Sequence, residues 1–166
     1  MTLEPLLSAA PEIRLHVAFA LVALIFGPVA IFRRRRDRIH RMLGYAGVAG
    51  MAGLAATGLL IDSDFPLVGT YGPIHLLSLY ALWSLASGVL AARRREFARH
   101  AAWMKTLWFT AIGITGLLTF LPGRVMNRMI FGEASPVGFW LMALGGAGLV
   151  LLWLWQRRPA RAARRA

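Results

Sequence analysis

The sequence predicts an all-α integral membrane protein with five transmembrane helices. The chain has 166 residues, of which 58% are hydrophobic and only 16% are charged. A soluble domain is closer to about half apolar and about a quarter charged. The apolar residues are gathered in long runs, and clusters of arginine separate several of these runs. This segregation is typical of a chain that folds in a lipid bilayer.

Five segments are long enough to cross the bilayer, because about 20 apolar residues in a helix span the ~30 Å of hydrocarbon. The connections between them are short, so we expect one membrane domain over residues 1–166. We expect the first four helices to form a four-helix bundle core, with the fifth helix packed outside it. The predicted spans are residues 13–32, 42–61, 74–92, 101–121 and 137–155.

The basic residues predict the orientation of the chain. Of its 19 Lys and Arg residues, only Arg14, Arg124 and Arg128 lie on the side that holds the N-terminus. The positive-inside rule therefore places the N-terminus outside and the C-terminus in the cytoplasm. The residues before the first helix carry no positive charge, and four arginines follow that helix, so we interpret it as an anchor and not as a signal peptide.

Composition also excludes several functions. The chain has no cysteine, which excludes disulfides and cysteine-ligated metal sites. Its net charge of +12 does not indicate nucleic-acid binding, because the basic residues flank apolar runs. No motif for hydrolysis or nucleotide binding is present. No carboxylate lies inside a predicted span, so a di-iron site of the carboxylate type is disfavoured.

Four histidines carry the main functional signal. His16 and His75 lie near the outer ends of the first and third helices, whereas His40 and His100 lie just before the second and fourth. About 16 residues at 1.5 Å each separate the two layers by roughly 24 Å. Two imidazoles on opposite helices at one depth are the axial ligands of a six-coordinate haem. We therefore expect these four residues to be metal ligands, with haem b, possibly two haems, as the cofactor.

Small residues and rim cations agree with this interpretation. Small residues recur at helical spacing beside His16 and His40, where a flat macrocycle needs room. Cations at the rims are suitable partners for haem propionates. The expected cofactor-binding cations are Arg41, Arg99 and Lys105 on the inner side and Arg14 and Arg124 on the outer side.

Other interpretations stay open. Histidines at helix ends also occur as interfacial residues, small residues also serve helix packing, and zinc or copper also binds imidazole. The haem interpretation predicts a membrane oxidoreductase that passes electrons between a quinol or small redox partner and an acceptor. The alternative is a cofactor-free membrane protein that acts as a transporter subunit or interaction scaffold. The absence of ionisable residues from the middle of the five spans disfavours transport.

The segment at about residues 123–132 is predicted to be a short amphipathic helix on the outer surface. Val125, Met126, Met129 and Ile130 fall on one helical face, with the polar residues Arg124, Asn127 and Arg128 opposite. Such a segment typically lies flat in the membrane interface.

The segments IHRMLGYAGV, IHLLSLYALWSL, HAAWM and TFLPGRVMNRMIFG resemble a bacterial membrane-protein family known as domain of unknown function 2306. That family has an HR-x-x-G-x-x-Y segment and a later H-x-x-W-M segment. His40, Arg41 and Gly44 match the first, and His100, Trp103 and Met104 match the second, whereas Tyr45 stands earlier than the tyrosine of the pattern. The resemblance implies a multi-pass protein of the bacterial cytoplasmic (inner) membrane. The alternating layout of the histidines is also similar, as an analogy, to cytochrome b561-type di-haem proteins.

Overall fold

The computed structural model describes residues 2–63, 65–132 and 135–156, and the prediction of an all-α chain is confirmed for these residues. They contain no β-strand beyond one isolated bridge between Val68 and Tyr71. In chain order the elements are α1 (Glu4–Leu7), α2 (Pro11–Phe32), α3 (Arg38–Gly58), α4 (Pro73–Arg93), α5 (Phe97–Leu107), the π-helix η1 (Trp108–Ile114), α6 (Thr115–Leu118), α7 (Val125–Phe131) and α8 (Val137–Gln156).

Helices α3 and α5 begin about four residues earlier than predicted. Asp37 is the N-cap of α3, and its carboxylate accepts a hydrogen bond from the His40 backbone N–H at 3.0 Å. Such a cap satisfies a free N–H and fixes the first turn. Helix α5 begins at Phe97, after the turn at Arg95, which has a positive φ of 62°. His40 and His100 therefore lie within the first turns of helices and do not precede them.

The predicted span at residues 101–121 consists of α5, η1 and α6 in one continuous helix. In η1 the backbone follows π-helical hydrogen bonding, which widens the helix locally. The first residue of η1, Trp108, packs its ring against Gly27 of α2, where an added Cβ would lie 3.0 Å from the indole Cδ1. The ring of Trp108 thus occupies the space that a larger residue at position 27 would fill.

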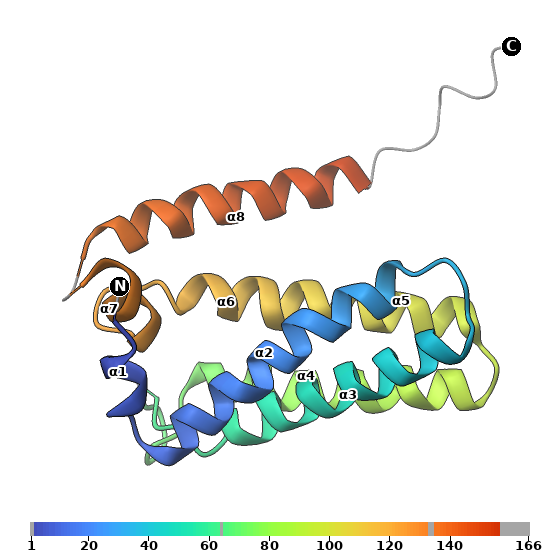
Figure 1. Cartoon of the computed structure of the whole chain (residues 1–166), viewed down its shortest axis with the longest axis horizontal. Coiled ribbons are helices and arrows are strands. Elements are labelled where there is room, and N and C mark those ends of the chain that lie inside the picture. Colours follow the sequence, from blue (N-terminus) through green and yellow to red (C-terminus); the bar gives the residue numbers. More distant parts are fainter. Residues whose placement is uncertain (1, 64, 133–134, 157–166) are drawn as a thin grey trace, which may run out of the picture.

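The long helices lie alongside one another (Figure 1). Helix α2 packs against α3 and α5, and α4 also packs against α3 and α5. Helices α3 and α5 therefore lie diagonally across the bundle from one another, as α2 and α4 do. Helix α8 touches α6, where Leu117 lies against Gly145.

Three helical stretches within the described residues are long and apolar enough to cross a membrane: Pro11–Phe32, Pro73–Arg93 and Phe97–Leu118. Helix α3 has a comparable length of 21 residues, but its first turn holds Arg38, His40 and Arg41 and its interior is rich in glycine. The part Val137–Leu151 of α8 is apolar but shorter. The prediction of five spans therefore stays a prediction.

Glycines on one face of α3 bring α2 and α3 into close contact. A Cβ added at Gly47 would lie 3.3 Å from the Gly27 Cα, and one at Gly50 would lie 2.7 Å from the Ala23 backbone N. Gly53 faces the ring of Phe19 in the same way. These small residues of α3 thus serve helix packing, which is the interpretation that competed with room for a macrocycle.

The segment after α6 forms the helix α7, as predicted. The amphipathic pattern placed Asn127 on the polar face, but in the structure its side chain is buried. Asn127 is 0% exposed, and its amide Nδ2 donates to the Phe120 carbonyl at 2.8 Å and to the Ser135 carbonyl at 3.1 Å. It joins the end of α6 to the start of α8. The need to satisfy these two carbonyls explains why Asn127 lies inside and not on the outer surface.

We predict that Gly50→Ala lowers the free energy of unfolding by about 1–3 kcal/mol, because its Cβ would overlap the α2 backbone. Gly44→Ala is the matched control on the same helix, since nothing lies within 4 Å of a Cβ there. The control should be neutral or gain up to about 1 kcal/mol from helix propensity. Unfolding in mixed detergent micelles, followed by circular dichroism, measures both. Equal stability of the two variants would contradict the close α2–α3 contact.

Candidate functional site

The turn between α2 and α3 fixes the position of His40. The Arg33 guanidinium donates two hydrogen bonds to the Asp37 carboxylate, with Nε–Oδ1 and Nη2–Oδ2 distances of 3.0 and 2.5 Å. These bonds, followed by the one from the His40 backbone N–H, hold the pKa of Asp37 well below its usual range. Asp37 therefore stays ionised, which suits its role as the cap of α3.

The imidazoles of His40 and His100 have equivalent hydrogen bonds. His40 Nδ1 lies 3.1 Å from the Ala30 carbonyl of α2, and His100 Nδ1 lies 2.8 Å from the Gly88 carbonyl of α4. Because a carbonyl only accepts, each Nδ1 carries the proton and each Nε2 keeps its lone pair. This arrangement, in which Nδ1–H is bound to a backbone carbonyl, is the one that orients histidine ligands of metals.

The surroundings of His40 favour its neutral form. Burial lowers the pKa of His40, and the charge of Arg36 lowers it further, while His100 contributes in the same direction. The electrostatic contribution of His100 shows that the two rings lie close enough to influence one another. The Arg36 Nη1 lies 3.4 Å from the His40 Nε2 and is its nearest donor. A neutral imidazole is the form that binds a metal.

On the outer side, His16 has the same tautomer. Its Nδ1 lies 3.0 Å from the Thr57 hydroxyl of α3, and that hydroxyl donates its own proton to the Gly53 carbonyl at 2.7 Å. Thr57 therefore accepts from His16 Nδ1–H, which leaves the lone pair on His16 Nε2. The Ser78 hydroxyl of α4 and the His16 ring both border Gly58, so three helices meet here.

His75 has the opposite tautomer and is 4% exposed. Its Nδ1 accepts from the Gly72 backbone N–H at 3.1 Å, and its Nε2 donates to the Ile61 carbonyl at 3.1 Å. The edge of Tyr71 covers the ring, with 4.9 Å between the centroids. Both nitrogens thus tie the two ends of the α3–α4 loop together.

The predicted cations lie near the histidines in the chain and mostly point outward. Arg41 and Arg99 follow and precede the inner histidines directly, and both side chains are exposed, as those of Lys105 and Arg14 are. Arg99 pairs with Glu96 at 3.2 Å. Arg124 is half-buried at the start of α7. Arg41 and Arg99 therefore lie at the same end of the bundle as His40 and His100.

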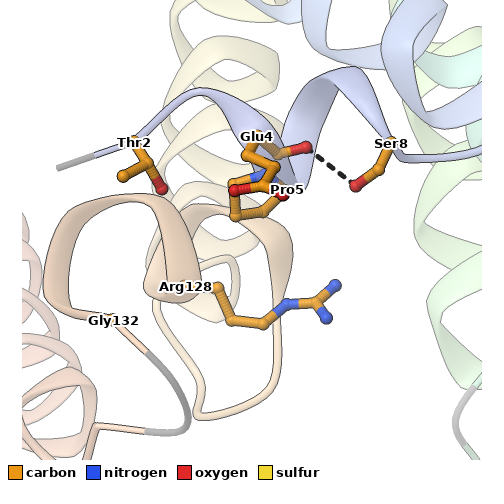
Figure 2. A pocket seen from close by; sticks show the side chains of 6 residues that line it. All are labelled: Thr2, Glu4, Pro5, Ser8, Arg128 and Gly132. Carbon is orange, nitrogen blue, oxygen red and sulfur yellow. Dashed lines mark hydrogen bonds between the residues drawn. The ribbon is translucent and has the colours of Figure 1, made fainter.

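A separate cleft of about 360 Å³ lies between α1 and α7. Figure 2 shows the Arg128 side chain extending past the residues of α1, and the Thr2 backbone N–H donates to the Met129 carbonyl at 3.1 Å. The lining residues are Thr2, Glu4, Pro5, Ser8, Arg128 and Gly132, so none of the four histidines belongs to this cleft. It is a surface feature apart from the histidine layers.

Within the part of the chain that the structure describes, no three residues of the His, Cys, Asp or Glu types form a group suited to a metal ion. The inner site offers two imidazoles from diagonal helices. Two protein ligands are the number that a bis-histidine haem uses, because its macrocycle supplies four further nitrogens.

The long apolar helices define an all-helical membrane protein. Residues 13–155 match the family described as "Predicted membrane protein (DUF2306)", so the chain belongs to this family and the resemblance is confirmed. Neither a curated protein nor a solved structure matches the chain. The similarity to cytochrome b561-type proteins stays a prediction.

The sequence did not predict the hydrogen-bond partners that determine the tautomer of each histidine. The Ala30 and Gly88 carbonyls carry no side-chain signal, so only the fold reveals them. His75 did have a signal, because it stands three residues after Gly72, at a helix start marked by Pro73. A polar side chain at that position commonly bonds back to the N-cap backbone.

We predict that His75→Leu speeds hydrogen exchange of the Gly72 amide by about tenfold, because this N–H loses its acceptor and a hydrogen bond is worth about 1 kcal/mol or slightly more. Exchange is measured by mass spectrometry of peptides that cover the α3–α4 loop. His16→Leu is the control, since its ring bonds Thr57 and not the loop. An unchanged Gly72 exchange rate in His75→Leu would show that the ring does not hold this loop.

Proposed function

We propose that this chain is a transmembrane electron-transfer protein in which His40 and His100 are the axial ligands of a haem b. The observation that carries the proposal is the matched pair of hydrogen bonds from His40 Nδ1 to the Ala30 carbonyl and from His100 Nδ1 to the Gly88 carbonyl. Each bond fixes a ring and leaves the lone pair of its Nε2 as the proposed ligand; at His40 the Arg36 Nη1 lies 3.4 Å from that atom and has to move aside for a metal.

The helix arrangement supports this assignment. Helices α3 and α5 carry the two histidines, and each packs against α2 and α4. Ligands from two diagonal helices would be able to hold a haem from both of its faces. Gly44, one turn after His40, has open space where a side chain would be. The donor set therefore fits a haem between two imidazoles.

When bound, a haem supplies a one-electron iron couple. The residues of this chain hold and tune it: the backbone carbonyls of Ala30 and Gly88 orient the imidazoles and make them more basic. Arg41 and Arg99 stand beside the histidines in the chain and are the proposed partners of the propionates.

The full form of the proposal has a second haem b between His16 and His75. His16 supports it, because its Nε2 keeps a lone pair as His40 and His100 do. His75 supports it less, because both of its nitrogens are hydrogen bonded to the backbone. A haem there requires His75 to leave the Ile61 carbonyl and to bind through Nε2, so we rank the inner centre first.

The proposal includes the topology that the sequence predicts. Five spans, an N-terminus outside and an arginine-rich C-terminus in the cytoplasm of a bacterium place His40 and His100 at the inner face. The excess of basic residues beside these histidines supports that orientation.

A cofactor-free scaffold or transporter subunit is the second candidate. The observation that favours it is the close packing at Gly47, Gly50 and Gly53, which uses the small residues of α3 for contact with α2. In that case the histidine bonds serve only to join neighbouring helices. The absorption spectrum decides between the two functions.

We predict that the wild-type protein, expressed with ample haem and purified gently, shows a Soret band and sharp α and β bands on reduction with dithionite. His40→Ala and His100→Ala should each abolish the six-coordinate inner centre, because its iron loses one axial bond. Arg35→Ala is the control, because Arg35 is an exposed charge in the turn before α3 to which no role at the haem is assigned. His75→Ala should leave the inner centre intact. Wild-type protein without a Soret band, or retention of the band in His40→Ala and His100→Ala, would overturn the assignment.

A further inference from the structure

Two tryptophans, one on α4 and one on α5, form an aromatic pair near His100. The rings of Trp83 and Trp103 meet edge to face, with their centroids 5.0 Å apart, and Tyr80 lies 6.0 Å from Trp83. Trp83 is 57% exposed although it lies near the middle of α4. Helix α4 is one of the stretches apolar enough to cross a membrane, so this exposed ring faces hydrocarbon.

Trp83 lies deeper along its helix than tryptophans of membrane proteins commonly do. Ten residues separate Trp83 from Arg93 at the end of α4, and six separate Trp103 from Phe97 at the start of α5. At 1.5 Å per residue these lengths are about 15 and 9 Å. Tryptophans of the interfacial belts lie at the headgroup level, where the indole N–H meets water or headgroups. Trp83 lies well below that level, whereas Trp103 lies one turn after Arg99 and two residues before Lys105, closer to the rim.

Neither indole N–H has a hydrogen-bond partner among the described residues of the chain. Hydrocarbon offers no acceptor, and an unsatisfied N–H in it is unfavourable by a few kcal/mol. The pair therefore combines two flat rings with two donors that lack an acceptor. This combination is complementary to a flat, lipid-soluble molecule that carries oxygen acceptors on a ring.

The pair is also connected to the proposed redox site. Trp103 packs against Gly88, where an added Cβ would lie 3.1 Å from the Trp103 Cβ. The same Gly88 accepts the hydrogen bond of His100 Nδ1 at 2.8 Å. Gly88 of α4 thus contacts both Trp103 and the imidazole of the proposed ligand His100.

We propose that Trp83 and Trp103 form a docking site for the ring of a membrane quinone. The indole N–H groups donate to its carbonyl oxygens, and the rings pack on its face. The choice of a quinone rests on the proposed electron-transfer function, since a quinone is the lipid-soluble redox molecule with this chemistry. The site itself lies outside the haem ligands, so its occupancy is measured separately.

The test uses decylubiquinone and the full chain in lipid nanodiscs, with binding measured by isothermal titration calorimetry. Trp83→Phe and Trp103→Phe keep a ring and remove the N–H donor, so the fold is retained, which circular dichroism checks. We expect the dissociation constant to rise about tenfold in the double variant, as the loss of donors worth about 0.5–1.5 kcal/mol each implies. Trp140→Phe on α8 is the matched control, because Trp140 is 72% exposed and lies on another helix. It should leave the constant unchanged.

The docking site is overturned if decylubiquinone does not bind the wild-type chain, or if the double variant and Trp140→Phe bind it equally well. Loss of oligomer cross-links in the double variant, without a change in quinone binding, would assign the pair to contact with a second copy and would also overturn it.

Binding is measured on haem-free and haem-loaded protein. Quinone binding that depends on Trp83 and Trp103 in a chain without a Soret band refutes the haem assignment alone. A Soret band with no effect of the two tryptophans refutes the docking site alone.

Discussion

The hydrogen bond between a histidine side chain and a neighbouring element is the interaction on which the site depends. A bilayer offers no water to polar groups, so each ring N–H within it must find an acceptor in the protein. His40 and His100 find it in a carbonyl of the preceding helix, His16 in a hydroxyl, and His75 in the Ile61 carbonyl of the loop after α3. The choice of acceptor determines which nitrogen keeps its lone pair, and therefore which histidines we propose as haem ligands.

The second constraint is the close approach of α2 and α3. Gly50 accommodates the α2 backbone, and Gly27 accommodates the ring of Trp108 from η1. These contacts hold α2 in place, and the carbonyl of Ala30 near its end is the partner of His40. The packing of small residues along the helices thus positions an acceptor at the inner rim. Glycines of α3 that suggested room for a cofactor instead bring the backbones of α2 and α3 together.

The sequence predicted the helices well because run length and arginine clusters report directly on the need to cross hydrocarbon. It predicted the start of α3 less well. The polar residues Arg38 and Arg41 suggested a loop, but the cap by Asp37 starts the helix before them. The π-helical segment was not predictable, because it results from the packing of Trp108 on α2. The burial of Asn127 was missed for a similar reason: its partners are two carbonyls that only the fold brings together.

For the histidines, the sequence predicted their depth but not their tautomers. The central claim is that His40 and His100 carry the proton on Nδ1, whereas His75 carries it on Nε2. Nitrogen-15 NMR of the haem-free protein, with the ring nitrogens labelled and assigned by single histidine substitutions, measures this directly. The account predicts a protonated Nδ1 and a lone pair on Nε2 at His40 and His100, with the reverse at His75. A protonated Nε2 at His40 or His100 would contradict it.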